Sequence, residues 1–199
     1  MVLKSLFWNV NGLNGQIKRA ACLDFLRRHS VDIAFIQESH LRSVDTQRFA
    51  NKFYYTVASA SLSSKNRGSL IVIKHNLSLN ILGKYVSEDD RVSYIKTIIA
   101  GHKFAFISIY APSLYEPDFF SKLISVLTQI HDYSFIIGAD MNACVNLALD
   151  KSITALYQLT LRLETPLPKL HVGDSIYHFF KMKNSVISFV ALVKEEILK

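Results

Sequence analysis

Chemically useful polar side chains follow several apolar segments of this sequence. The stretch FIIGADMN runs from apolar residues into Asp140 and Asn142, a carboxylate and an amide two positions apart. Three other apolar segments end in Asn9, Glu38 and Tyr110. Strand ends can gather at one edge of a layered α/β sheet, where binding sites are commonly built. The pattern therefore indicates a site made of carboxylate, amide and phenol groups.

Such a site suits a hard cation and a phosphate ester. Mg²⁺ takes one or two carboxylates and completes its shell with water or phosphate oxygens. We therefore expect Glu38 to be the metal ligand, with an oxygen such as that of Asn9 nearby. A bound metal would stabilise charge on a phosphate and on its leaving oxygen. Asp140 would orient or deprotonate the attacking water, while Asn142, Asn9 and Tyr110 would hold phosphate oxygens.

Each of these residues also has a purely structural interpretation. The Asn-Gly pair at 11–12 is a common turn signal. Glu38 could be a solvated or helix-capping acid, and Tyr110 could be a half-buried core aromatic. Asp140 and Asn142 could form a local Asx turn. The functional interpretation rests on the whole set occurring in order along the chain.

Composition places the chain among globular proteins with a basic surface. Its 199 residues are enough for one domain with a core, and half of them are apolar. The formal charge of +7 suits a polyanion such as nucleic acid. No apolar run approaches the roughly 20 residues of a membrane span, and residues 1–8 are too short for a secretory signal. Cys22 and Cys144 fit no metal spacing, which indicates ordinary thiols in a reducing, intracellular compartment.

The elements that would position the site alternate between strands and helices. Residues 3–10 predict a strand, 17–29 an amphipathic helix and 31–37 a buried strand, which favours a layered α/β fold. A strand-rich middle follows, with a hairpin about Gly101–His102. The expected strands are 53–60, 69–75, 77–86, 92–100, 103–111 and 133–140, with a second helix over 116–131.

The last fifty residues differ in character. Residues 151–164 predict an amphipathic helix, 165–174 a loop and 175–180 a short strand. The segment 184–199 is apolar and then charged, and its type is ambiguous, with a helix favoured at the very end.

The ordered blocks FWNVNGLNGQIKR, DIAFIQESHL, RGSLIVI, FISIYAPS and FIIGADMNA resemble the endonuclease/exonuclease/phosphatase superfamily. They are most similar to the endonuclease domain of LINE-type (non-LTR) retrotransposons. The resemblance covers about residues 3–150. It implies a four-layer α/β sandwich, like that of deoxyribonuclease I, with two central sheets and helices outside. It also implies a Mg²⁺-dependent phosphodiesterase that nicks DNA, for which a nuclear location follows from the resemblance alone.

The family's functional residues carry over by position. Asn9 and Glu38 match the asparagine and the metal-ligand glutamate, and Tyr110 matches the tyrosine near the scissile phosphate. Asp140 and Asn142 match the Asp-x-Asn that orients water and binds phosphate. Three residues after the first strand are candidate substrate contacts. Asn11 stands where apurinic endonucleases carry a second acid, and Lys18 and Arg19 are basic residues suited to phosphate.

The resemblance weakens after residue 150. YHFF at 177–180 looks like one further family block, but Phe189 and Ala191 stand where the family's next block has arginine and aspartate. A final Ser-Asp-His block is absent from the sequence. We therefore expect residues 1–150 to form the domain core, 151–199 to form a divergent, incomplete remainder of the same domain, and catalysis to be weak or lost.

Two other functions stay open from the sequence. One is a non-catalytic, basic DNA-binding protein, and the other is a phosphomonoesterase of the same superfamily acting on a small phosphate ester. No membrane contact and no obligate protein partner are indicated. The candidate phosphate contacts for DNA binding are Lys18, Arg19, Arg27, Arg28, Lys65 and Arg67, although for Arg27 and Arg28 on the helix a solvated surface is the favoured interpretation.

Overall fold

The computed structural model describes residues 3–61, 68–112, 114 and 116–140, together with the backbone of four short strands between 170 and 189. The first sheet has the strand order β1-β2-β4-β3, and the second has the order β11-β12-β8-β7-β6-β5. The first sheet consists of β1 (Ser5–Asn9), β2 (Ile33–Gln37), β3 (Tyr54–Ala60) and β4 (Ser69–Lys74). The second consists of β5 (Asn80–Val86), β6 (Val92–Ile99), β7 (His102–Tyr110), β8 (Ser134–Asp140), β11 (Phe179–Met182) and β12 (Ser185–Phe189). A separate ribbon pairs β9 (Leu170–Val172) with β10 (Ser175–Tyr177).

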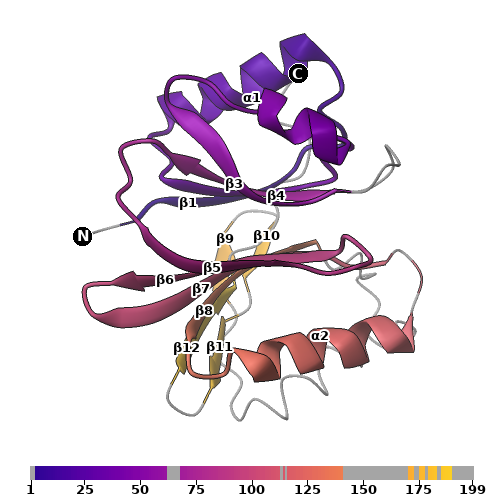
Figure 1. Ribbon diagram of the computed structural model, residues 1–199, viewed down its shortest axis with the longest axis vertical. Coiled ribbons are helices and arrows are strands. Elements are labelled where there is room, and N and C mark those ends of the chain that lie inside the picture. The colour runs from indigo at the N-terminus through magenta and orange to yellow at the C-terminus, as the bar shows by residue number, and fades with distance from the viewer. Residues whose placement is uncertain are drawn as a thin grey trace.

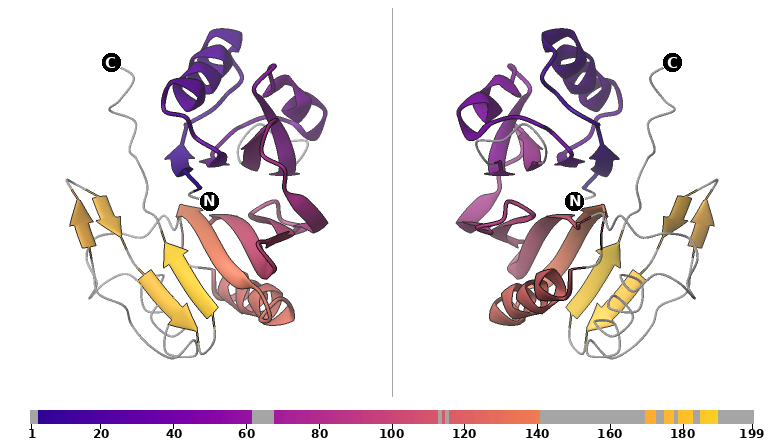
Figure 2. Two further views of the ribbon diagram at one scale, coloured as in Figure 1. Left: turned by 90° about the vertical axis from the view of Figure 1, so that its left-hand side faces the viewer. Right: turned by 90° about the vertical axis from the view of Figure 1, so that its right-hand side faces the viewer.

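Four layers are stacked in this fold, as the resemblance implies (Figure 1). Helix α1 (Gln16–Arg28) covers the outer face of the first sheet, and α2 (Pro117–Gln129) covers the outer face of the second. Figure 2 shows the same order of layers from the side. Aromatic side chains fill the space between the sheets, including the stacked rings of Phe7 and Phe35 and the ring of Phe106. The fold predicted from the sequence is confirmed.

Both helices follow from their apolar spacing. In α1 the buried side chains are Cys22, Leu23 and Leu26, and basic residues end the helix, where they suit its dipole. In α2 the buried residues recur at the spacing of one helix face, and they are Phe119, Phe120, Leu123, Val126 and Leu127. Pro117 occupies the first turn of α2, where its missing N–H costs little. Each helix buries one stripe against its own sheet.

The hairpin between β6 and β7 has the geometry that a two-residue turn requires. Ile99 pairs with His102, and the intervening Ala100 and Gly101 both have positive φ, 51° and 81°. Two positive φ values define the type I′ turn, whose twist matches that of the flanking strands. The predicted hairpin is therefore confirmed.

Two local elements differ from the sequence prediction. A 3₁₀ helix, η1 (Ser43–Arg48), was not predicted, and β9 lies where a loop was expected. The segment 184–199 was ambiguous from the sequence, and its residues 185–189 form β12, which pairs with β8 in parallel and with β11 in antiparallel. The helix predicted over 151–164 lies outside the described residues.

Candidate active site at the strand ends

Strand register brings polar residues to one edge of the space between the sheets. Asn9 pairs with Gln37 at the ends of β1 and β2, and Tyr110 pairs with Asp140 at the ends of β7 and β8. Side chains two residues apart in a strand share a face. Asn9 therefore faces the second sheet, because Phe7 of the same strand packs between the sheets.

A hydrogen bond joins the two sheets at this edge. The Asn9 side-chain amide Nδ2 donates to Asp140 Oδ2 at 2.6 Å, although the two residues are 131 positions apart. Asn9 Oδ1 accepts a hydrogen bond from the backbone N–H of Asn11 at 3.0 Å, and the Asp140 backbone carbonyl accepts one from Ala111 at 2.7 Å. Asp140 is only 6% exposed. Asn9 thus holds a largely buried carboxylate in place through its amide nitrogen, and its expected metal ligation stays a prediction.

A polar layer lies directly beneath these residues. Gln37 is buried, and its Nε2 lies 3.4 Å from Ser108 Oγ and 3.3 Å from the Gly138 carbonyl oxygen, both in the opposite sheet. Ser69 and Ser93 are 3.2 Å apart through their hydroxyl oxygens and join the sheets beside it. Sequence reasoning missed Gln37, although a glutamine inside the apolar run IAFIQ was a usable signal.

Glu38 interrupts the strand pattern where β2 ends. Its φ is +51°, a left-handed conformation that is uncommon for glutamate and that clusters at functional sites. Its backbone carbonyl accepts a hydrogen bond from Gly12 at 2.6 Å. The carboxylate is half-buried, and no hydrogen bond or ion pair engages it within the described part of the chain. Its oxygens are therefore available to a ligand.

Of the three predicted substrate contacts, Asn11 lies in the loop between β1 and α1, and Lys18 and Arg19 lie in the first turn of α1. Asn11 has a φ of +43°, as its turn interpretation requires. Lys18 Nζ donates to the Asn11 carbonyl at 3.1 Å, and Arg19 Nη1 donates to the carbonyls of Leu13 and Asn14 at 2.8 and 2.7 Å. Both cations therefore brace the loop that lies against Glu38.

The backbone of Tyr110 is hydrogen-bonded to Arg91, a residue that sequence reasoning did not single out. Its backbone N–H donates to the Arg91 carbonyl at 2.8 Å. The Arg91 side chain is buried, with its guanidinium 3.4 Å from a Glu116 carboxylate oxygen and 5.9 Å from the centre of the Phe119 ring. This contact ties the end of β7 to α2. Asn142, the remaining predicted site residue, lies outside the described residues.

The donor set fits magnesium better than zinc. Within the described ranges, no three histidine, cysteine, aspartate or glutamate side chains come together to hold a metal. The edge offers the carboxylates of Glu38 and Asp140 and the amide oxygen of Asn9. Mg²⁺ is typically bound by one or two carboxylates with water and phosphate, whereas zinc sites use three or four nitrogen, sulfur or carboxylate ligands. Glu38 is the residue available to hold such an ion.

Two stacked sheets, each covered by a helix and edged by polar strand ends, define a four-layer α/β sandwich. Comparison with known proteins names its family. The chain belongs to the endonuclease/exonuclease/phosphatase family, whose sequence model matches residues 6–177.

Three similar proteins show how widely this fold is used. A probable RNA-directed DNA polymerase from the transposon X-element of Drosophila melanogaster is 24% identical over 145 residues, 72% of this chain and 15% of that protein. The endonuclease domain of TRAS1, a telomere-specific non-LTR retrotransposon, has a TM-score of 0.56 at 12% identity, covering 87% of this chain and 80% of that one. A mannosyl-6-phosphatase of Bacteroides thetaiotaomicron also has a TM-score of 0.56, at 17% identity, covering 80% and 71%.

The chain is thus similar in sequence to a transposon protein and belongs to a family whose name covers endonucleases, exonucleases and phosphatases. The chain spans about 15% of the length of the X-element relative. The two structural likenesses show the fold alone, because one fold serves many substrates. No helix in the described ranges is long and apolar enough to cross a membrane.

Proposed function

We propose that this protein is a Mg²⁺-dependent phosphodiesterase that nicks DNA, at a rate well below that of a complete family site. The observation that carries the proposal is the Asn9–Asp140 hydrogen bond of 2.6 Å. It fixes a largely buried carboxylate at the edge where Glu38 and Tyr110 also lie. A carboxylate oriented in this way is suited to accept a proton from water.

The expected reaction assigns one task to each residue. Glu38 would hold the magnesium ion, which when bound supplies positive charge for the phosphate and its leaving oxygen. Asp140 would take the proton of the attacking water as the new phosphorus–oxygen bond forms. The bond to the leaving sugar oxygen breaks, and that oxygen takes a proton from solvent. Tyr110 and Asn142 would hold the non-bridging phosphate oxygens.

The low rate is expected from two positions near the end of the chain. Phe189 and Ala191 stand where the family pattern has arginine and aspartate. Loss of one positioned acid–base or electrostatic group costs about 100- to 10,000-fold in rate. Ala191→Asp should therefore raise the rate of nicking, whereas a rate equal to that of the parent would contradict this explanation.

Nicking of supercoiled plasmid tests the proposal. Purified protein should convert the plasmid to its open circular form with Mg²⁺ and not with EDTA. Glu38→Gln should abolish this conversion, and Glu88→Gln, which removes the same charge from an exposed turn, should not. Nicking that survives EDTA or the Glu38 variant would overturn the assignment of Glu38.

A second candidate function is DNA binding without catalysis, for which the formal charge of +7 is the specific support. Contacts with phosphates release counterions, so DNA affinity should fall steeply as salt rises. Tight, salt-sensitive binding with no metal-dependent nicking would favour this function. The resemblance to retrotransposon endonucleases suggests the nucleus as the place where either activity on DNA would occur. Hydrolysis of a small sugar phosphate in place of plasmid would instead favour the phosphatase branch.

A further inference from the structure

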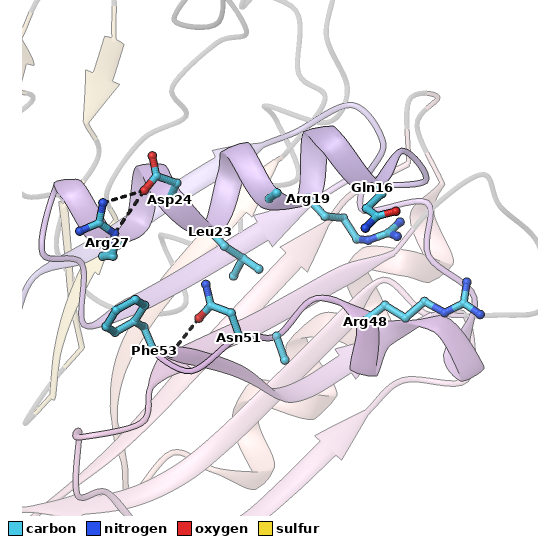
Figure 3. Close-up of a pocket in the computed structure, with 10 residues that line it drawn as sticks. Gln16, Arg19, Leu23, Asp24, Arg27, Arg48, Asn51 and Phe53 are labelled. Atoms are coloured by element: carbon cyan, nitrogen blue, oxygen red, sulfur yellow. Dashed lines mark hydrogen bonds and ion pairs between the residues drawn. The ribbon is translucent and has the colours of Figure 1, made fainter.

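A groove lies along one side of α1, apart from the strand-end residues. It encloses about 480 Å³ between α1 and the segment that joins η1 to β3. Figure 3 shows Arg19 and Arg48 toward one end of the groove and Arg27 and Phe53 toward the other. None of Asn9, Glu38, Tyr110 and Asp140 lines it. The lining residues are Gln16, Arg19, Ala20, Leu23, Asp24, Arg27, Arg48, Ala50, Asn51 and Phe53.

The two elements that border the groove are strongly basic. Helix α1 and residues 42–53 together carry seven cationic side chains and only two carboxylates, Asp24 and Asp45. This excess of five positive charges accounts for most of the formal +7 of the chain. The cations are Lys18, Arg19, Arg27, Arg28, Arg42, Arg48 and Lys52. A face with this charge attracts polyanions.

Its arginines can exchange their present partners for a phosphate. Arg27 and Arg28 share Asp24, and all three of these side chains are at least a third exposed, so their ion pairs contribute only about 0–1 kcal/mol. Arg48 lies 3.2 Å from the largely buried Asp45, which would keep its ion pair with Arg42 if Arg48 turned toward a phosphate. Guanidinium groups bind phosphate through paired N–H donors. A phosphate that enters the groove therefore has little to displace.

An exposed aromatic ring favours a nucleic acid over an acidic peptide. Phe53 is 38% exposed. Lys52 Nζ and the Arg27 guanidinium carbon lie 5.1 and 5.9 Å from the centre of its ring. An aromatic ring flanked by cations can stack on a base while the cations contact the adjoining phosphates. Single-stranded DNA leaves the faces of its bases open to such a ring.

We infer that the groove between α1 and residues 48–53 binds a single-stranded DNA segment, as a contact separate from the strand-end site. This inference rests on DNA being the substrate of the proposed function. Arg19 and Arg27 are eight residues apart on α1, which is about 12 Å along the helix. That separation spans more than one phosphate of a strand. Arg19 would link the groove to the active-site loop, because its side chain already binds the carbonyls of Leu13 and Asn14.

Binding of a fluorescein-labelled single-stranded DNA 12-mer, followed by anisotropy in EDTA, tests the inference. The double variant Arg27→Gln/Arg48→Gln should weaken binding and reduce the slope of log affinity against log salt by about 1.4, at roughly 0.7 per phosphate contact. Phe53→Ala should weaken binding at least about fivefold. Lys84→Gln/Lys122→Gln removes the same charge from exposed positions on the side of the second sheet and is the matched control.

Asp24→Asn should change the affinity for DNA in the opposite direction from the other groove variants. The Arg27 hydrogen bond lowers the pKa of the Asp24 carboxyl, so that this group stays ionised and repels phosphate. Its removal should therefore tighten DNA binding. Weaker binding by this variant would overturn the inference, as would equal losses in the groove and control double variants. Thermal melts of each variant establish that these exposed substitutions leave the fold intact.

Two further comparisons separate the groove from the proposed function. Competition by poly-glutamate as effective as that by unlabelled DNA of equal charge would overturn the assignment to nucleic acid. Metal-dependent nicking together with unchanged DNA binding by the groove variants would sustain the function and overturn the groove. Groove-dependent binding without any nicking would sustain the groove and overturn the function.

Discussion

Gly138→Ala should destabilise the protein strongly, although it adds only a single methyl group. No unusual backbone torsion requires glycine at this position. The requirement is steric, because a Cβ there would overlap the Phe7 ring and lie 2.6 Å from Phe35 Cβ. Ordinary carbon contacts are about 3.5–4.0 Å. The two rings are buried and stacked 4.5 Å apart, so neither can move aside without opening the space between the sheets.

The expected loss is about 3 kcal/mol of unfolding free energy, at the upper end of the usual cost of overpacking. For a chain of this length, this loss lowers the melting temperature by roughly 6–12 °C. Differential scanning calorimetry measures it. Gly15→Ala is the control, because a Cβ there meets nothing within 4 Å, and its melting temperature should stay near that of the parent. A Gly138→Ala protein as stable as the parent would refute the close approach of the sheets beneath the site.

Three other predictions concern the scaffold. Tyr54→Phe should lower the free energy of unfolding in urea by about 1–3 kcal/mol, because the buried hydroxyl donates toward two backbone carbonyls at 2.9 and 2.8 Å. An unchanged free energy of unfolding would show that these contacts are not formed. Ala100→Asn should raise the free energy of unfolding by up to about 1 kcal/mol, since asparagine tolerates the positive φ of this turn better than alanine. A lower free energy of unfolding in the same urea assay would contradict the type I′ turn. Burial raises the pKa of the Cys22 thiol to about 11. In a Cys144→Ser background, the Cys22 thiol should therefore resist a thiol reagent at pH 8 until the protein unfolds. Rapid labelling of the native protein would show that Cys22 is accessible.

Local patterns predicted the strand ends but not the contacts between them. An apolar run followed by a polar residue placed Asn9, Tyr110 and Asp140 at the ends of strands, as the structure has them. Their convergence depends on the register of two different sheets. The Asn9–Asp140 hydrogen bond crosses 131 residues and the gap between the sheets. No periodicity within one strand could reveal it.

Residues whose partners come from another part of the fold were harder to interpret. Gln37 looked like one more strand residue, because its hydrogen-bond partners lie in the opposite sheet. Lys18 and Arg19 were expected to contact substrate, but their present partners are loop carbonyls, which the local sequence does not identify. Residues 185–189 are apolar enough for a helix or a strand, and pairing with β8 decides the outcome. Long-range pairing accounts for Gln37 and for residues 185–189, whereas Lys18 and Arg19 bind carbonyls five to seven residues away and their role toward substrate stays a prediction.

Two aspartates of one segment give the most direct test of the strand-end site. Asp140 ends β8 at the proposed site, whereas Asp132 precedes β8 at its other end, where it is exposed and bound to Lys103 at 2.7 Å. The rate of Mg²⁺-dependent plasmid nicking should fall about 100- to 10,000-fold in Asp140→Asn and stay at the parent level in Asp132→Asn. Equal nicking by the two variants, or none by the parent protein, would contradict the proposal that the strand-end site hydrolyses DNA.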